Sequence, residues 1–294
     1  MTSIEWSMAQ LASIDREKLF VAVFGLAGIV LGAWLTSRRD TTRRVLEEIT
    51  AIRAARALCF AIINRLFTLK EQMILPLHRD YYMEREGLAA AREAATAGST
   101  KTIQARMDLQ LLSPFGTPMQ LLERLVFDRM SCPSTGLLAA AEFVSTMDAF
   151  SKSVEYRNVL VIDFQRRGAE LGDADRVLTY FGLPRAGFVD QRIEMNVNAL
   201  YRQLDDCIFF GQMLDEQLLA HGRRLRHRHL WRYRLATPKF VEADWSLAAQ
   251  KGLVPSRARY PSLVSAFRSK PSMLRRIVTK DPGKPQKKAG SARR

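Results

Sequence analysis

The residues from Leu19 to Leu35 form an uncharged apolar run, LFVAVFGLAGIVLGAWL, in a chain of which 26% of the residues are charged. Such a run requires surroundings other than water. As a helix it is roughly 26 Å long at about 1.5 Å per residue, and Thr36 and Ser37 extend it toward the roughly 30 Å hydrocarbon core of a bilayer. We therefore predict a single transmembrane helix over residues 19–37, preceded by a short non-cytoplasmic segment, residues 1–18.

The residues beside the run predict a retained anchor and its orientation. No pair of small residues suited to signal-peptide cleavage follows it, because Trp34, Leu35 and Arg38-Arg39 occupy that region. Only Arg16 and Lys18 precede the run. Six arginines lie within about twenty residues after it, namely Arg38, Arg39, Arg43, Arg44, Arg53 and Arg56. By the positive-inside rule we expect a bacterial inner-membrane protein with its N terminus outside and its bulk in the cytoplasm.

Two glycines inside the run suggest a contact between membrane helices. Gly28 and Gly32 form a G-x-x-x-G pair, which lies on one helix face and allows a second helix to approach closely. Glycine is also common in membrane helices without any such role. A homodimer through Gly28 and Gly32 is therefore one of two open interpretations.

Three apolar repeats after the run predict an all-α bundle. Their members recur at steps of three and four residues, which places each set on one helix face. The sets are Val45, Ile52, Cys59, Leu66 and Met73; Phe143, Met147, Phe150, Val154, Val161 and Phe164; and Ile193, Val197, Leu200, Leu204, Cys207, Gly211, Leu214, Leu218 and Leu225. We expect antiparallel long helices over residues 38–234, with Pro76 ending the first. Asp40-Thr41-Thr42 can either cap that helix or continue it from the membrane.

The C-terminal part of the chain differs in charge and composition from the rest. Residues 221–294 contain 20 Lys and Arg against three acidic residues, a net charge of +17, whereas the first 220 residues are nearly neutral. Six of the eleven prolines lie from Pro238 onward, and the last fourteen residues have no large apolar side chain. We therefore expect residues 235–294 to be a basic, largely disordered tail.

Motifs for catalysis or cofactor binding are absent from the sequence. It has no phosphate-binding or dinucleotide-binding loop and no zincin helix, and no glutamate stands three residues before a histidine. We predict no catalytic, cofactor-binding or metal-binding residue. His221, His227 and His229 lie among six arginines, which disfavour a bound cation, and His221 is expected to pack in its helix. The adjacent acidic pairs are expected on solvated faces; they are Glu47-Glu48 and Asp205-Asp206.

The arginine-rich segments are the best candidates for a binding surface. Their side chains suit anionic lipid headgroups beside the membrane, and with an aromatic residue they also suit nucleic acid. A simple solvated helix end is the third interpretation. The candidate residues are Arg38, Arg39, Arg43, Arg44, Arg223, Arg224, Arg226, Arg228, Trp231, Arg232 and Arg234.

Three function classes remain open from the sequence. We favour a non-enzymatic scaffold, adaptor or regulatory protein that is anchored in the membrane and binds an unknown protein partner. A membrane-tethered nucleic-acid-binding protein is the first alternative. The second is an enzyme with an all-helical site, which a buried, converging cluster of Asp80, Glu142, Asp163 and Asp206 would favour and an entirely apolar bundle interior would disfavour.

Overall fold

The computed structural model describes residues 16–96, 105–113, 116–168, 170–184, 188–233 and 239–267. Every regular element in this part of the chain is a helix, which confirms the all-α prediction. The helices are α2 (Arg16–Leu69), α3 (Leu75–Thr96), α4 (Met119–Asp128), α5 (Ser134–Gly168), α6 (Asp173–Tyr180), α7 (Arg192–Tyr233), α8 (Ser246–Gln250) and α9 (Pro261–Phe267). Two short segments complete the set: the π-helix η1 (Lys70–Ile74) and the 3₁₀ helix η2 (Arg257–Arg259).

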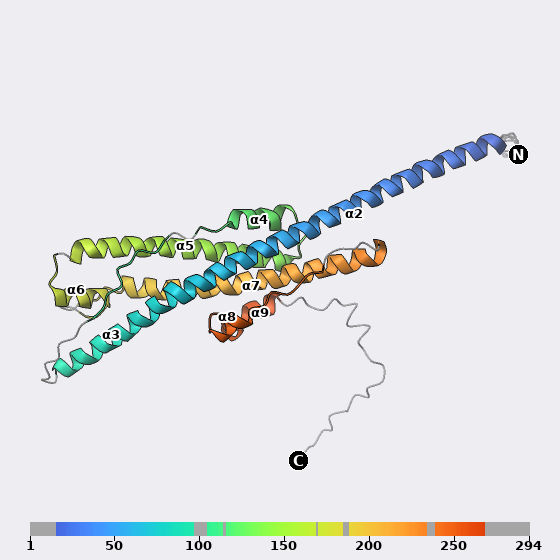
Figure 1. The fold of residues 1–294 in the computed structure, drawn as a ribbon. Coiled ribbons are helices and arrows are strands. Elements are labelled where there is room, and N and C mark those ends of the chain that lie inside the picture. Colours follow the sequence, from blue (N-terminus) through green and yellow to red (C-terminus); the bar gives the residue numbers. More distant parts are fainter. Residues whose placement is uncertain are drawn as a thin grey trace, which may run out of the picture.

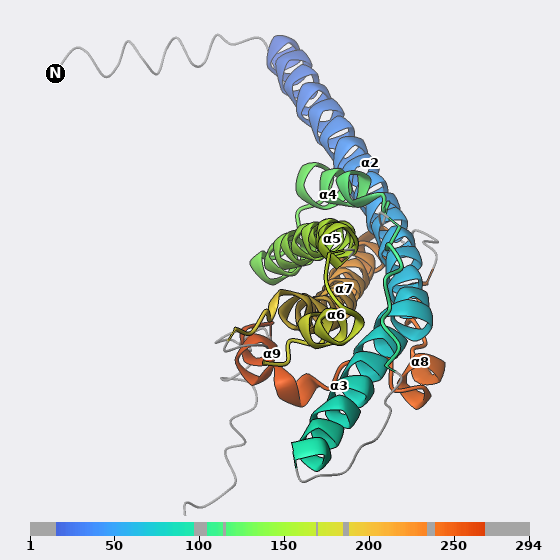
Figure 2. The same ribbon diagram turned by 90° about the vertical axis from the view of Figure 1, so that its left-hand side faces the viewer.

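Helix α7 lies at the centre of the bundle and packs against α2 on one side and α5 on the other (Figures 1 and 2). It runs antiparallel to both. The three predicted apolar repeats form the core, and most of their members are buried. Gly211 of α7 allows a close approach, because a Cβ atom there would lie 2.9 Å from Ile63 of α2 and 3.1 Å from Phe143 of α5.

Helix α2 runs without a break from the apolar run into the bundle. Its first part extends beyond the other helices (Figure 1), and Val45 is the first buried residue among its described side chains. The hydroxyl groups of Thr41 and Thr42 donate to the carbonyl oxygens of Ser37 and Arg38, one turn earlier. These residues therefore continue the helix, and the alternative that they cap a new one is wrong.

The predicted span over residues 19–37 is only partly described. Within the described residues, no helix meets the length and hydropathy required to cross a membrane. Residues 1–15 and the side chains of Leu19 and Ala22 lie outside that part of the chain.

Pro76 does not end the first helix, contrary to the prediction from sequence. A proline ring collides with the carbonyl group four residues earlier, here that of Gln72, and it has no N–H to donate. Gln72 lies in η1, where the Leu75 N–H donates to the Lys70 carbonyl oxygen across five residues. This wider turn makes room for the ring, so α3 continues from α2.

Part of the predicted disordered tail is folded against the bundle. Residues 239–267, called the strap below, contain α8, η2 and α9. Phe240, Leu253 and Phe267 of the strap are buried. The prediction of a largely disordered segment over 235–294 is therefore wrong for 239–267, because these apolar side chains pack on the bundle instead of forming a core of their own. Residues 268–294 lie outside the described residues.

The close packing at Gly211 gives a stability prediction. Gly211→Val should lower the free energy of unfolding by about 1–3 kcal/mol, because its methyl groups have no room between Ile63 and Phe143. Gly87→Val on α3 is the matched control, since no atom lies within 4 Å of a Cβ there. Chemical denaturation followed by circular dichroism compares the two, and equal midpoints would contradict the close approach.

Candidate functional site

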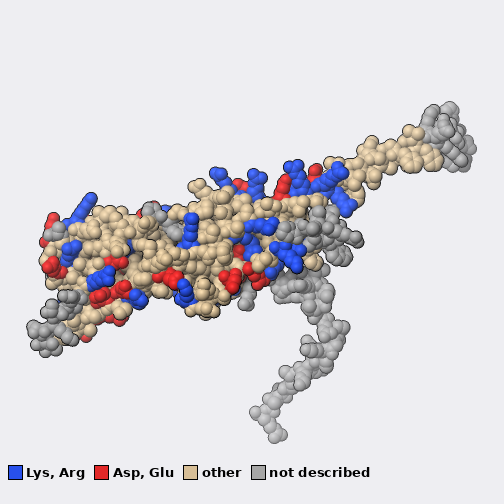
Figure 3. Space-filling model, in the orientation of Figure 1, with Lys and Arg blue, Asp and Glu red and all other residues tan. Residues whose placement is uncertain are grey.

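Two groups of arginines, distant in the sequence, lie at one end of the bundle. One group follows the apolar run on α2 and the other lies near the end of α7. Because α7 is antiparallel to α2 and His221 contacts Glu48, residues after 221 lie beside residues before 48. Lys and Arg side chains gather where the apolar part of α2 leaves the bundle (Figure 3). We call this set the basic end: Arg38, Arg39, Arg43, Arg44, Arg223, Arg224, Arg226 and Arg228.

Most side chains of the basic end face the solvent. Seven of its eight arginines are exposed and Arg226 is half-buried. Two form ion pairs at exposed positions, Arg43 with Glu47 at 2.9 Å and Arg223 with Glu242 at 2.8 Å. Such pairs are worth little in water, so an anionic ligand can replace the carboxylates at low cost.

Of the two tryptophans at this end, the structure describes the side chain of Trp34 but not that of Trp231. The guanidinium carbon of Arg38 lies 5.2 Å from the centre of the Trp34 ring, a cation–π contact at the last turn of the apolar run. An indole ring with a neighbouring cation is typical of a membrane interface. The side chains of Trp231 and Arg232, and the whole of Arg234, lie outside the described residues.

A partly buried hydrogen-bond cluster joins α7 to α2 beneath the basic end. One oxygen of Glu48 lies 2.8 Å from His221 Nε2 and accepts from the Ser131 hydroxyl at 2.7 Å and the Ser131 N–H at 2.8 Å. Burial tends to raise the pKa of Glu48, but the hydrogen bonds from His221 and Ser131 outweigh it and the pKa is lowered. The prediction that His221 packs in its helix is confirmed. The solvated face predicted for Glu48 is wrong, because His221 and Ser131 cover its carboxylate.

A second buried ionic cluster overturns the prediction for Asp205-Asp206. Asp205 pairs with Lys70 of η1 at 2.6 Å, and both side chains are almost completely buried. Asp206 accepts from the Tyr260 hydroxyl of the strap at 2.6 Å. The expected solvated face is instead covered, because cations and hydroxyl groups from distant segments satisfy the carboxylates.

The four carboxylates that would favour an enzyme pair locally or with different partners. Asp80 is exposed beside Arg79, Asp163 pairs with Arg167 and Arg192, and Asp206 bonds to Tyr260. The fourth, Glu142, is half-buried on α5, and none of the hydrogen bonds or ion pairs seen joins any two of the four. Among the described residues, no group of three or more His, Cys, Asp or Glu is arranged to hold a metal ion.

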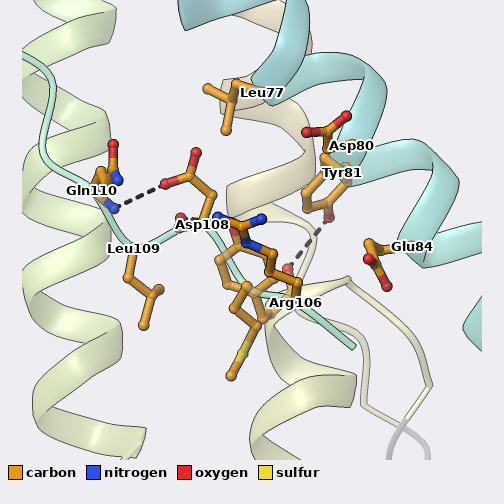
Figure 4. Close-up of a pocket in the computed structure, with 10 residues that line it drawn as sticks. Leu77, Asp80, Tyr81, Glu84, Arg106, Asp108, Leu109 and Gln110 are labelled. Atoms are coloured by element: carbon orange, nitrogen blue, oxygen red, sulfur yellow. Dashed lines mark hydrogen bonds between the residues drawn. The ribbon is translucent and has the colours of Figure 1, made fainter. Parts of the chain in front are cut away.

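A pocket of about 270 Å³ lies beside α3 (Figure 4). The pocket is lined by Asp80, Tyr81 and Glu84 of α3, by Arg106 and Asp108 of the segment 105–113, and by Tyr180. The Tyr81 hydroxyl donates to the Tyr180 carbonyl oxygen at 3.3 Å, and the Asp108 carboxylate accepts from the Gln110 N–H at 3.0 Å. The Tyr81 hydroxyl and the Asp108 carboxylate therefore have backbone partners, and Asp80 pairs with Arg79, so these groups do not point to a ligand.

The cysteines offer no reactive thiolate in the described structure. All three are free. Burial raises the pKa of Cys132 to about 11 and that of Cys207 to about 12, and it raises the pKa of Cys59 further. These thiols therefore remain protonated at neutral pH and act as small apolar side chains.

Comparison with protein families, characterised proteins and solved structures finds no match for this chain. The functional argument therefore depends on the geometry of the chain itself.

Sequence reasoning selected the arginines of the basic end one by one but missed their convergence. Aligning the first and third apolar repeats as antiparallel partners would have placed Arg44 near Arg224. It also missed the role of Glu48, for which the sequence carries no signal, because the partners Ser131 and His221 come from distant segments.

The Glu48 cluster predicts a pH-dependent contribution to stability. Glu48→Gln should lower the free energy of unfolding by about 1–2 kcal/mol at pH 7, because a neutral amide oxygen is a weaker acceptor for Ser131 and His221 than a charged carboxylate. A lowered pKa means that the carboxylate stabilises the fold above its ordinary value of 4.5 and that this benefit is lost as the pH falls through the folded-state value. The difference between wild type and Glu48→Gln should therefore shrink below pH 4.5 in denaturant titrations. A constant difference from pH 7 to pH 3 would contradict this role.

Proposed function

We propose that this chain is a single-pass membrane protein of a bacterial inner membrane, with its helical bundle in the cytoplasm. The observation that carries the proposal is the position of the basic end directly beside the apolar part of α2. The described side chains there are exposed on every face of the helix, from Phe20 at 61% to Leu35 at 45%. A continuous apolar surface of this kind is stable only when another apolar phase covers it.

The two arginine groups support the orientation with the N terminus outside. Those on α2 are the signal of the positive-inside rule, and those on α7 add positive charge at the same level of the molecule. Each basic residue held near the anionic inner leaflet contributes about 1 kcal/mol of binding free energy. Seven exposed arginines therefore favour a cytoplasmic bundle whose base contacts lipid headgroups. Nucleic acid is the less favoured ligand, because this base faces the bilayer.

The shape of the bundle supports a scaffold, adaptor or regulatory role. Helix α2 and its continuation α3 extend from the base to the far end of the bundle (Figure 1). The 32 residues from 38 to Leu69 span about 48 Å at about 1.5 Å per residue. The distal surface is thereby held away from the membrane, where a protein partner can reach it. Gly28 and Gly32 have open space around them, which leaves room for a second membrane helix.

Reporter fusions test the topology in cells. With a cytoplasm-dependent reporter fused after Arg294 we expect full activity, and with a periplasm-dependent reporter we expect none. Replacing Arg38, Arg39, Arg43 and Arg44 by Gln should increase the fraction of inverted molecules, because the charge bias after the run is reduced. Activity of the periplasm-dependent reporter in the unmodified chain would overturn the proposed orientation.

Hydrogen exchange tests the lipid contact. The full chain is reconstituted in nanodiscs of neutral lipid alone or with 30% anionic lipid, and amide exchange is followed over residues 219–229. We expect exchange there to slow at least threefold with anionic lipid, and the effect to vanish in 0.5 M salt, because exposed charges are screened.

Matched variants separate the basic end from charge in general. Arg223, Arg224 and Arg228 changed to Gln should abolish the protection by anionic lipid. Arg79, Arg166 and Arg202 changed to Gln remove the same charge elsewhere on the bundle and should not. Stronger protection by RNA than by anionic lipid at equal phosphate concentration would favour the nucleic-acid alternative. These variants are preferable to deleting residues 222–294, which also removes the strap.

A further inference from the structure

The strap covers a surface formed by α2, η1 and α7, which we call the groove, and the chemistry of this surface is complementary to that of the strap. Aromatic side chains of the strap stack on aromatic side chains of the groove: Trp245 lies 5.0 Å from Phe60, and Tyr260 lies 4.0 Å from Phe209, between ring centres. Trp245 also meets the edge of Phe67. Aromatic anchors in apolar seats are typical of peptide recognition.

Charges are complementary along the same groove. In three pairs the strap supplies the cation and the groove supplies the carboxylate; the reverse pair is Glu242 of the strap with Arg223 of α7. Lys251 pairs with Glu71 at 2.7 Å, Arg257 with Glu216, and Arg259 with Asp205 at 2.5 Å.

Two ion pairs beneath the strap are formed without any strap residue. Lys70 with Asp205 and Arg56 with Asp215 are pairs between η1 or α2 and α7, and neither pair needs the strap. The strap adds the carbonyl oxygens of Leu253 for Lys70 and of Val241 for Arg56, and its Arg259 is a second cation at Asp205. These four charged side chains would therefore keep an ionic partner if the strap dissociated. An unpaired buried charge would be the main cost of removing a segment that belongs to a core.

The strap also lacks the means to fold alone. Its helical elements have five, three and seven residues, too short to be stable without a partner surface. Gly222 of α7 provides the seat for its first anchor, because a Cβ there would lie 2.6 Å from the ring of Phe240.

We propose that the groove between α2 and α7 is a binding site for basic peptides with aromatic anchors, and that residues 239–267 of the same chain are its resident, reversibly docked ligand. The groove supplies a seat at Gly222, aromatic platforms at Phe60 and Phe209, and carboxylates at Asp205 and Glu216. The site adjoins the basic end, which the strap contacts through the pair of Glu242 with Arg223.

The test cleaves the chain between α7 and the strap and measures whether the strap exchanges with free peptide. A site for a sequence-specific protease is inserted after Thr237 in the full chain, which is then cleaved in neutral detergent at low salt. We expect the fragment 239–294 to co-elute with the rest in size-exclusion chromatography. An excess of labelled synthetic peptide 239–267 should then replace it.

Two variants make the test specific. Gly222→Ala fills the seat of Phe240 and should weaken peptide binding about tenfold, although alanine favours the helix. Leu247→Ala on α8 is the matched control, because Leu247 is 67% exposed and its loss should change nothing. Circular dichroism of the uncleaved variants verifies that both are folded.

Three results would overturn the proposal. The fragment could separate from the rest at once after cleavage, which would mean that the groove has no useful affinity. It could remain bound for a day without exchange in excess peptide, which would make the strap a permanent part of the core. Equal binding by wild type and Gly222→Ala would disprove the seat. Since no anionic lipid is present, none of these results bears on the proposed lipid contact.

Discussion

The antiparallel pairing of α2 with α7 is the contact on which the other features of this molecule depend. It buries the first and third apolar repeats against each other, with Gly211 allowing the two helices to meet closely at Ile63. The same pairing fixes the level of every residue on α7 relative to α2. It therefore places Arg224 beside the start of the bundle and brings Lys70 to Asp205. A one-turn slip of about 5.4 Å would separate both sets of partners.

Local patterns in the sequence were sufficient for the helices but not for their boundaries. The repeats from Val45, Phe143 and Ile193 predicted the core faces because burial of apolar side chains follows the helical period directly. Pro76 misled the prediction, since the π-turn that accommodates its ring is a backbone adjustment with no compositional signal. The threonines at 41 and 42 can serve either in a cap or within a helix, and only the continuous α2 decided between them.

Polar and C-terminal features were harder to predict because their partners are distant in sequence. Asp205 has the composition of a surface residue, and its burial depends on Lys70, 135 positions earlier. The apolar residues of the strap are too sparse to form a core of their own, which led to the prediction of disorder. They become ordered because the groove supplies the missing partners, such as Phe60 for Trp245 and Phe209 for Tyr260. Sparse aromatic residues in a basic segment therefore indicate a docked segment as readily as a disordered one.

The charge distribution connects the two proposals without making one depend on the other. Arginines at the base remain exposed, with weak surface partners such as Glu47 and Glu242, so they keep their charge available to an external anion. Cations of the strap instead meet carboxylates of the groove, Arg259 at a side chain that is almost fully buried. Salt screens this half-buried pair less than a fully exposed pair, and it does not screen the aromatic contacts of the strap. Rising salt should therefore weaken the basic end before it releases the strap, so that one titration distinguishes the two surfaces.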